Sequence, residues 1–173
     1  RLFRHVHMLQ HTLQAVHRIA TMSRMSSSTP ALLAIGETMA LVTPRDATPL
    51  ADTDQVELTI GGAESNVAMH VAGLGGDAGW ISALGDDALG QRVRRTISAH
   101  GVDTRWVEFD AQAPTGVYFK DPGHGVLYYR AGSAASRMTP ATIAGIPLEE
   151  ARVVHVSGIT PALSEGCATL IGA

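Results

Sequence analysis

The residues most suited to ligand chemistry begin with a pair of glycines, Gly61 and Gly62. The polar residues Ser65 and Asn66 follow, in what the spacing of the next apolar residues predicts to be the first turn of a helix. Such a turn presents free backbone N–H groups, and glycines let a small polar or anionic ligand approach them closely. The stretch predicts a ligand-binding turn, but a tight strand-to-helix turn with glycines required only for geometry fits it as well.

A second candidate for binding chemistry is Arg130, which ends a predicted aromatic strand and precedes the small, flexible stretch 131–136. A guanidinium is a planar fork that suits a carboxylate. Side chains two residues apart share a face of a strand, so Tyr128 and Arg130 can point into one pocket while Tyr129 faces the other side. The alternative is an aromatic strand packed into the core, with a solvated arginine at its end.

Three predicted strands that alternate with helices would position these residues, at 32–35, 79–84 and 153–156. This order is typical of an α/β fold with a doubly wound, mainly parallel sheet. Ligands of such sheets bind beyond the carboxyl ends of the strands, where Glu37 and the Gly61–Gly62 turn would lie.

Three further strands have no helix between them, at 55–60, 116–120 and 126–130. They predict a small antiparallel flap, or lid, that projects from the main sheet. Thr115 and Gly116 are expected to form its hinge.

Other reactive side chains are assigned structural roles. Asp86 or Asp87 is expected to cap a helix, and His70 and His155 lie within apolar patterns typical of packed core histidines. Cys167 stands at helical spacing among leucines and an isoleucine, which predicts a buried thiol. With this single cysteine no intrachain disulfide can form, which fits a reducing cytoplasm.

Composition argues against several functional classes. A hydrophobic content of 45% with 17% charged residues is that of a globular protein. A net charge of −3 gives no basic footprint for nucleic acid, and the apolar runs are too short to span a membrane. The run Gly73-Leu74-Gly75 would have to follow a strand and open a helix to bind a dinucleotide, but it ends a predicted helix, so nicotinamide binding is rejected.

The two ends of the chain differ from the middle. Residues 1–36 carry four arginines, four histidines and no acidic residue, and a Ser-rich stretch precedes Pro30. We interpret residues 1–30 as a disordered or non-native leader and 31–173 as one domain. The last predicted helix, 163–173, has no stop signal, so the chain reads as truncated.

Short blocks along the chain resemble, in order and spacing, the N-terminal half of the PfkB (ribokinase-like) sugar kinases, and most closely the 2-keto-3-deoxygluconate kinase branch. The resemblance runs from about Leu32 to the end of the chain and covers half of such an enzyme. The blocks are Leu32–Glu37, Gly61–Ala68, Ala83–Gly90, Thr115–Phe119, Tyr128–Ala134 and Val156–Leu163.

The resemblance implies an ATP-dependent kinase acting on the C6 hydroxyl of 2-keto-3-deoxygluconate, with Mg²⁺ accompanying ATP. Tyr118, Tyr128 and Arg130 would hold the carboxylate and keto end of the sugar acid, and Gly62 and Asn66 would contact its hydroxyls. The implied substrate-binding residues are Glu37, Gly61, Gly62, Asn66, Tyr118, Tyr128 and Arg130.

The position of Glu37 is one where many of these kinases place an aspartate against substrate hydroxyls. In the family, the C-terminal half supplies most of the nucleotide site and a Gly-Ala-Gly-Asp-type segment, whose aspartate is the catalytic base. No such segment occurs in this sequence, so no catalytic residue is expected here and the chain alone is predicted to be inactive. Two alternatives stay open: another PfkB sugar kinase of fructokinase or ribokinase type, and a catalytically dead binding fragment. The expected partners are the sugar acid, ATP and a second copy of the chain, joined through the flap.

Overall fold

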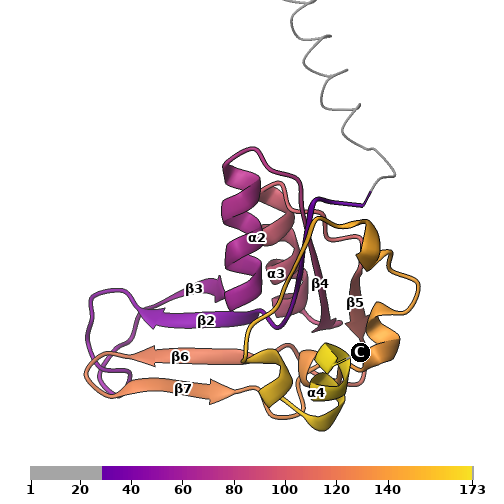
Figure 1. Ribbon diagram of the computed structural model, residues 1–173. Helices are drawn as coiled ribbons and strands as arrows, with labels where there is room; N and C mark the ends of the chain where they lie inside the picture. The colour runs from indigo at the N-terminus through magenta and orange to yellow at the C-terminus, as the bar shows by residue number, and fades with distance from the viewer. Residues whose placement is uncertain (1–28, 173) are drawn as a thin grey trace, which may run out of the picture.

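The computed structural model describes residues 29–172, which form two four-stranded sheets and the helices that pack on them (Figure 1). The main sheet has the strand order β5-β4-β1-β8, and all its neighbours are parallel. Its strands are β1 (Leu32–Ile35), β4 (Ala78–Gly85), β5 (Val107–Asp110) and β8 (Val153–His155). The predicted α/β fold with a parallel sheet is confirmed.

Alternation along β1 divides the core into two layers. Leu32 and Ala34 face helices α2 (Ala63–Gly73) and α3 (Ala88–Ala99), where Trp80 is fully buried. Leu33 and Ile35 face the opposite layer, which contains α4 (Glu165–Gly172). Because successive side chains of a strand point to opposite faces, an apolar run of this kind needs cover on both sides, and the helices supply it.

Short 3₁₀ helices complete the layer that holds α4. They are η1 (Ala135–Arg137), η2 (Pro140–Ile143), η3 (Leu148–Glu150) and η4 (Thr160–Ala162). Cys167 of α4 is fully buried there, and its thiol donates to the carbonyl of Ala135 at 3.3 Å, so the predicted core thiol is confirmed.

The flap is a second sheet of order β3-β2-β6-β7, which projects to one side of the main sheet (Figure 1). Its strands are β2 (Met39–Pro44), β3 (Val56–Gly61), β6 (Val117–Asp121) and β7 (Gly125–Tyr129). The outer pairs are antiparallel, but β2 and β6 pair in parallel, so the expectation of a purely antiparallel flap is corrected. Two helices and three strands separate β2 from β6, and a long crossover of this kind joins parallel strands.

Two expectations about burial are wrong. The apolar, β-branched run at 152–156 favours a core strand, but the strand at 153–155 forms at the sheet edge, where Val153 and Val154 are 52% and 42% exposed. His70 is exposed on α2, with its Nδ1 2.7 Å from the carbonyl oxygen of Asn66, and His155 is half-buried. Both histidines stand in apolar sequence, but His70 lies on the exposed side of α2 and His155 in the edge strand β8.

The interpretation of residues 1–30 as a leader falls almost wholly outside the described residues. Between residues 29 and 172, no helix is both long and apolar enough to cross a membrane.

Candidate functional site

The turn that starts α2 lies at the junction of the two sheets. Gly62 is the N-cap of the helix, and a side chain at this position would overlap the hydroxyl of Thr38 and the backbone carbonyl of Glu37. Thr38 in turn donates to the hydroxyl of Ser65 at 2.7 Å. This close approach is by itself a sufficient reason for the glycine, so the turn does not by its geometry require a ligand.

A pair of stacked tyrosines reaches from the flap to this turn. Tyr118 of β6 lies directly opposite Tyr128 of β7, with ring centroids 5.7 Å apart. A side chain on Gly61 would overlap the hydroxyl of Tyr118, so the phenol lies against the bare backbone of Gly61. Tyr129 points to the other face of the flap and packs edge-on against Phe119, as the alternation of the strand predicts.

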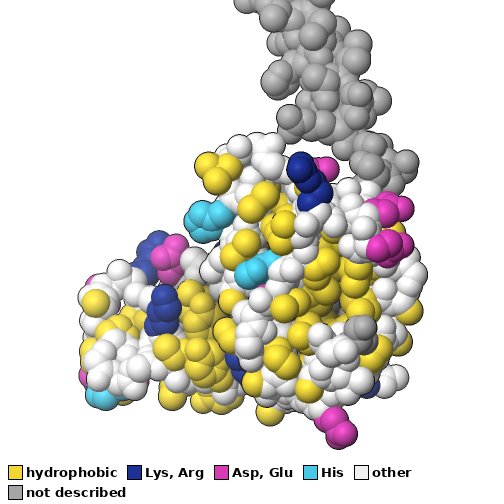
Figure 2. Space-filling view, in the orientation of Figure 1, with side chains coloured by type: hydrophobic (Ala, Val, Ile, Leu, Met, Phe, Trp, Pro, Cys, Tyr) yellow, Lys and Arg dark blue, Asp and Glu magenta, His cyan; other side chains and the backbone are white. Residues whose placement is uncertain are grey.

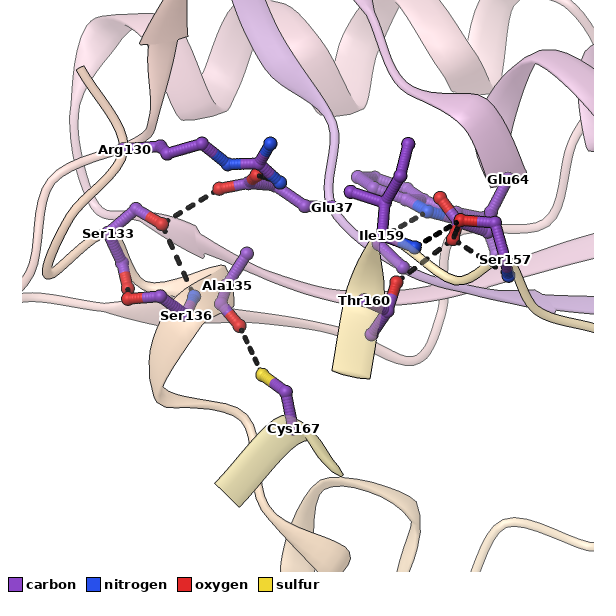
Figure 3. Close-up of polar contacts among 12 residues, drawn as sticks. Glu37, Glu64, Arg130, Ser133, Ala135, Ser136, Ser157, Ile159, Thr160 and Cys167 are labelled. Atoms are coloured by element: carbon purple, nitrogen blue, oxygen red, sulfur yellow. Dashed lines mark hydrogen bonds and ion pairs between the residues drawn. The ribbon is translucent and has the colours of Figure 1, made fainter. Parts of the chain in front are cut away.

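Arg130 forms an ion pair with Glu37 at the carboxyl end of β1 (Figure 3). The Glu37 side chain is 1% exposed and that of Arg130 is 22% exposed, so the carboxylate lies beneath the guanidinium. The other Glu37 oxygen accepts a hydrogen bond from the hydroxyl of Ser133 at 2.8 Å. The guanidinium carbon also lies 5.6 Å from the ring centroid of Tyr128, which confirms that Tyr128 and Arg130 share one face of the flap.

Burial raises the pKa of Glu37 above its ordinary value, although Arg130 and Ser133 act in the opposite direction. Burial also raises the pKa of Tyr118, with a smaller contribution from Tyr128. Among residues 29–172, Nε of Arg130 is buried and has no hydrogen-bond partner. A buried donor without a partner is costly and uncommon, so this atom indicates where a ligand oxygen would bind.

Six of the seven residues expected to bind substrate therefore lie in one connected group: Glu37, Gly61, Gly62, Tyr118, Tyr128 and Arg130. Asn66 lies in the first turn of α2, with its N–H bonded to the carbonyl of Gly62 at 3.1 Å. Its side chain is exposed, and the structure records no contact between it and the group.

Two further buried polar residues were not anticipated. Ser133, 1% exposed, lies in the small-residue stretch 131–136, whose composition predicts only flexibility. Glu64, 1% exposed in the first turn of α2, accepts with Oε1 from the N–H of Ser157 (3.1 Å), its hydroxyl (2.5 Å) and the hydroxyl of Thr160 (2.9 Å; Figure 3). A side chain on Gly36 would overlap this carboxylate, so Glu64 ties the helix start to the segment after β8, alongside β1. Nothing in the local pattern pairs residues so far apart in the chain.

Asp87 joins α3 to the base of the flap. Its Oδ1 accepts from the N–H of Gly90 at 2.7 Å, which confirms the predicted cap, and its Oδ2 accepts from the N–H of Thr115 at 2.8 Å. Partial burial raises the pKa of Asp87, but the hydrogen bonds from Thr115 and Gly90 outweigh it and hold the pKa below its ordinary value. The hydroxyl of Thr115 also accepts from the N–H of Gly85, at the end of β4, at 3.0 Å, so this expected hinge residue is attached to both α3 and the main sheet.

Other features carry no further site. The N–H of Gly75, at φ 84°, donates to the carbonyl of Ala72 at 2.9 Å, so the run around Gly73 caps the end of α2, as predicted. A separate hollow of about 390 Å³ beside β5 is lined in part by Asp110 and Arg137, which pair at 3.2 Å. Within residues 29–172, no group of three or more His, Cys, Asp or Glu side chains could hold a metal ion.

Comparison with known proteins identifies the chemistry of similar chains. The sequence profile of the pfkB family of carbohydrate kinases matches residues 30–171. The chain is 37% identical over 142 residues to 2-dehydro-3-deoxygalactonokinase from Haloferax volcanii and 38% identical over 136 residues to 2-dehydro-3-deoxygluconokinase from Bacillus subtilis. These alignments cover 79% and 75% of this chain, and plant fructokinases match as well.

The fold comparison agrees. The crystal structure of 2-dehydro-3-deoxygluconokinase from Thermotoga maritima superposes with a TM-score of 0.77 at 31% identity, over 82% of this chain. That match covers 45% of the Thermotoga chain, and the two sequence matches cover 44% and 41% of their relatives. The chain therefore spans less than half the length of these relatives.

Proposed function

Because this chain belongs to the pfkB family of carbohydrate kinases, we propose that it is the substrate-binding part of an ATP-dependent kinase for 2-keto-3-deoxygluconate (2-dehydro-3-deoxygluconate). The product would be the 6-phosphate of this sugar acid, and the reaction would serve sugar-acid catabolism in the cytoplasm. The names of the relatives from Haloferax, Bacillus and Thermotoga support this choice within the family.

The observation that carries the proposal is the buried Nε of Arg130, for which residues 29–172 provide no hydrogen-bond partner. The substrate differs from neutral sugars by its carboxylate, which a guanidinium binds through charge-assisted hydrogen bonds. The ring of Tyr128 lies against the same guanidinium, and Tyr118 stacks on Tyr128, so the phenols and the cation line one surface. This surface suits the acid and keto end of the sugar.

The turn before α2 supplies the other end of the proposed pocket. Gly61 lies against the hydroxyl of Tyr118, Gly62 follows it at the helix start, and Asn66 presents an exposed side-chain amide in the first helical turn. Hydroxyl groups of the sugar would bind these atoms.

ATP, Mg²⁺ and self-association through the flap belong to the proposal for the whole enzyme. We assign none of the described residues to ATP or Mg²⁺, and we expect the chain alone to bind the sugar acid without phosphorylating it.

Calorimetric titration of the full chain tests the proposal. The ligands are 2-keto-3-deoxygluconate, its galactonate epimer, fructose and ribose. We expect both sugar acids to bind more tightly than either neutral sugar. Tighter binding of fructose or ribose would favour a fructokinase or ribokinase type, and binding of none of the four sugars would overturn the assignment of the pocket.

A further inference from the structure

The Glu37 carboxylate is close to the proposed pocket but closed off from it. Its side chain is 1% exposed and both of its oxygens face protein groups: Ser133 on one side and Arg130 on the other. A side chain on Gly116 would come within 3.0 Å of Oε1, so the backbone closes a further side. A ligand could reach Glu37 only by displacing Ser133 or Arg130.

Burial increases from the guanidinium to the carboxylate, which gives the two charges different roles. Arg130 is partly exposed and keeps one donor, Nε, that no group in the described part of the chain (29–172) accepts, whereas Glu37 lies beneath the guanidinium. A guanidinium has five N–H donors, so one carboxylate can hold it from below while a second carboxylate binds from the open side. A buried carboxylate is costly unless paired, and Arg130 is the cation that pairs with it.

We propose that Glu37 is a positioning residue: held by Ser133, it fixes the guanidinium of Arg130 for the carboxylate of the sugar acid and does not itself contact the sugar. This inference rests on the proposed function, since it concerns the same pocket. It differs from the expectation drawn from the family resemblance, in which Glu37 would contact hydroxyls directly. By this route Glu37 contributes to the preference for acidic over neutral sugars.

A double-mutant cycle on the full chain tests the role, with the Kd for 2-keto-3-deoxygluconate measured by calorimetry. Glu37→Gln keeps the shape of the side chain and removes its charge, and Arg130→Met removes the guanidinium at similar length. We expect Glu37→Gln alone to weaken binding of the acid about tenfold, the equivalent of one charge-assisted hydrogen bond. In the Arg130→Met background the same change should alter the Kd by less than about twofold.

Control variants distinguish a loss of the position of Arg130 from a loss of the folded structure. Ser133→Ala removes the hydroxyl that holds Glu37, so it should weaken binding in the same direction and should also lose its effect in the Arg130→Met background. Glu108→Gln, at an exposed position of β5, should leave the Kd unchanged. Melting temperatures show which variants are folded. If Glu37→Gln is not folded, Ser133→Ala replaces it in the double-mutant cycle with Arg130→Met.

The outcomes decide whether Glu37 positions Arg130 or contacts the sugar itself. Additive effects of Glu37→Gln and Arg130→Met would mean that Glu37 contacts the sugar itself and would overturn the inference alone. An unchanged Kd in folded Glu37→Gln would do the same. If the unaltered chain binds no sugar acid, the proposed function fails, and the inference fails with it.

Discussion

Replacing Glu64 by alanine should destabilise the chain by about 2–4 kcal/mol. The side chain is 1% exposed, and one of its oxygens accepts all three hydrogen bonds from Ser157 and Thr160. The two hydroxyls can rotate toward other partners, but the backbone N–H of Ser157 cannot and is left without an acceptor. A lost charge-assisted hydrogen bond is worth about 1.5–3 kcal/mol, and an unsatisfied donor adds to this loss.

Two further variants separate the hydrogen bonds from other effects. Glu64→Gln keeps an oxygen acceptor of the same shape, so it should cost only about 1 kcal/mol, the difference between a charged and a neutral acceptor. Glu108→Ala removes an exposed carboxylate from β5 and should change the free energy of unfolding by less than about 0.5 kcal/mol.

Urea unfolding of the full chain, followed by circular dichroism, measures these differences. The midpoint should fall for Glu64→Ala while the m-value stays the same, because the surface exposed on unfolding is similar. If Glu64→Ala is no more destabilising than Glu108→Ala, the buried carboxylate does not join α2 to the segment after β8, and the reasoning from its contacts is wrong.

The remaining predictions concern the pocket, a helix cap and the flap. Arg130→Ala should weaken calorimetric binding of 2-keto-3-deoxygluconate by about 1.5–3 kcal/mol, whereas Arg95→Ala, on the exposed side of α3, should leave it unchanged. Gly61→Ala should push the hydroxyl of Tyr118 aside and weaken the same binding. The melting temperature should change little, because the tip of the tyrosine side chain can move. A lower melting temperature with unchanged binding would count against a role of the Gly61–Tyr118 contact in the pocket. Asp87→Ala should lower the free energy of unfolding by about 0.5–2 kcal/mol, because the helix loses its cap. Because the folded-state pKa of Asp87 is lowered, this difference should be complete above about pH 4 and should shrink below it. Urea unfolding at several pH values measures the difference. Sedimentation should show self-association that rises with concentration, because β7 exposes large apolar side chains over the flap (Figure 2); a monomer at every concentration would argue against it.

Hydrophobic patterning was sufficient for the main sheet and its helices. The apolar runs at β1 and β4 are covered on both faces, and Asp87 caps α3 where a polar residue precedes an apolar periodicity. These features depend on short stretches of sequence, where period and capping chemistry act directly. Three of the four strands of the flap, β3, β6 and β7, were predicted for the same reason.

Pairings between distant residues could not be predicted in the same way. The pairing of β2 with β6 joins residues far apart in the chain, and no local periodicity marks it. Tyr128 and Arg130 were placed on one face by the alternation of a strand, but the partner of Arg130, Glu37, lies far away in the chain. The exposure of His70 depends on which side of α2 packs on the sheet, and the local apolar pattern did not indicate that side.

The central claim is that the flap and the turn before α2 form one pocket for a sugar acid. The most direct test is a ¹H–¹⁵N NMR titration of the full chain with 2-keto-3-deoxygluconate. Shifts confined to the backbone amides of Gly61, Gly62 and Asn66 and to the Nε–H of Arg130 are the predicted result. Shifts that gather instead around Asp110, in the hollow beside β5, would contradict the account.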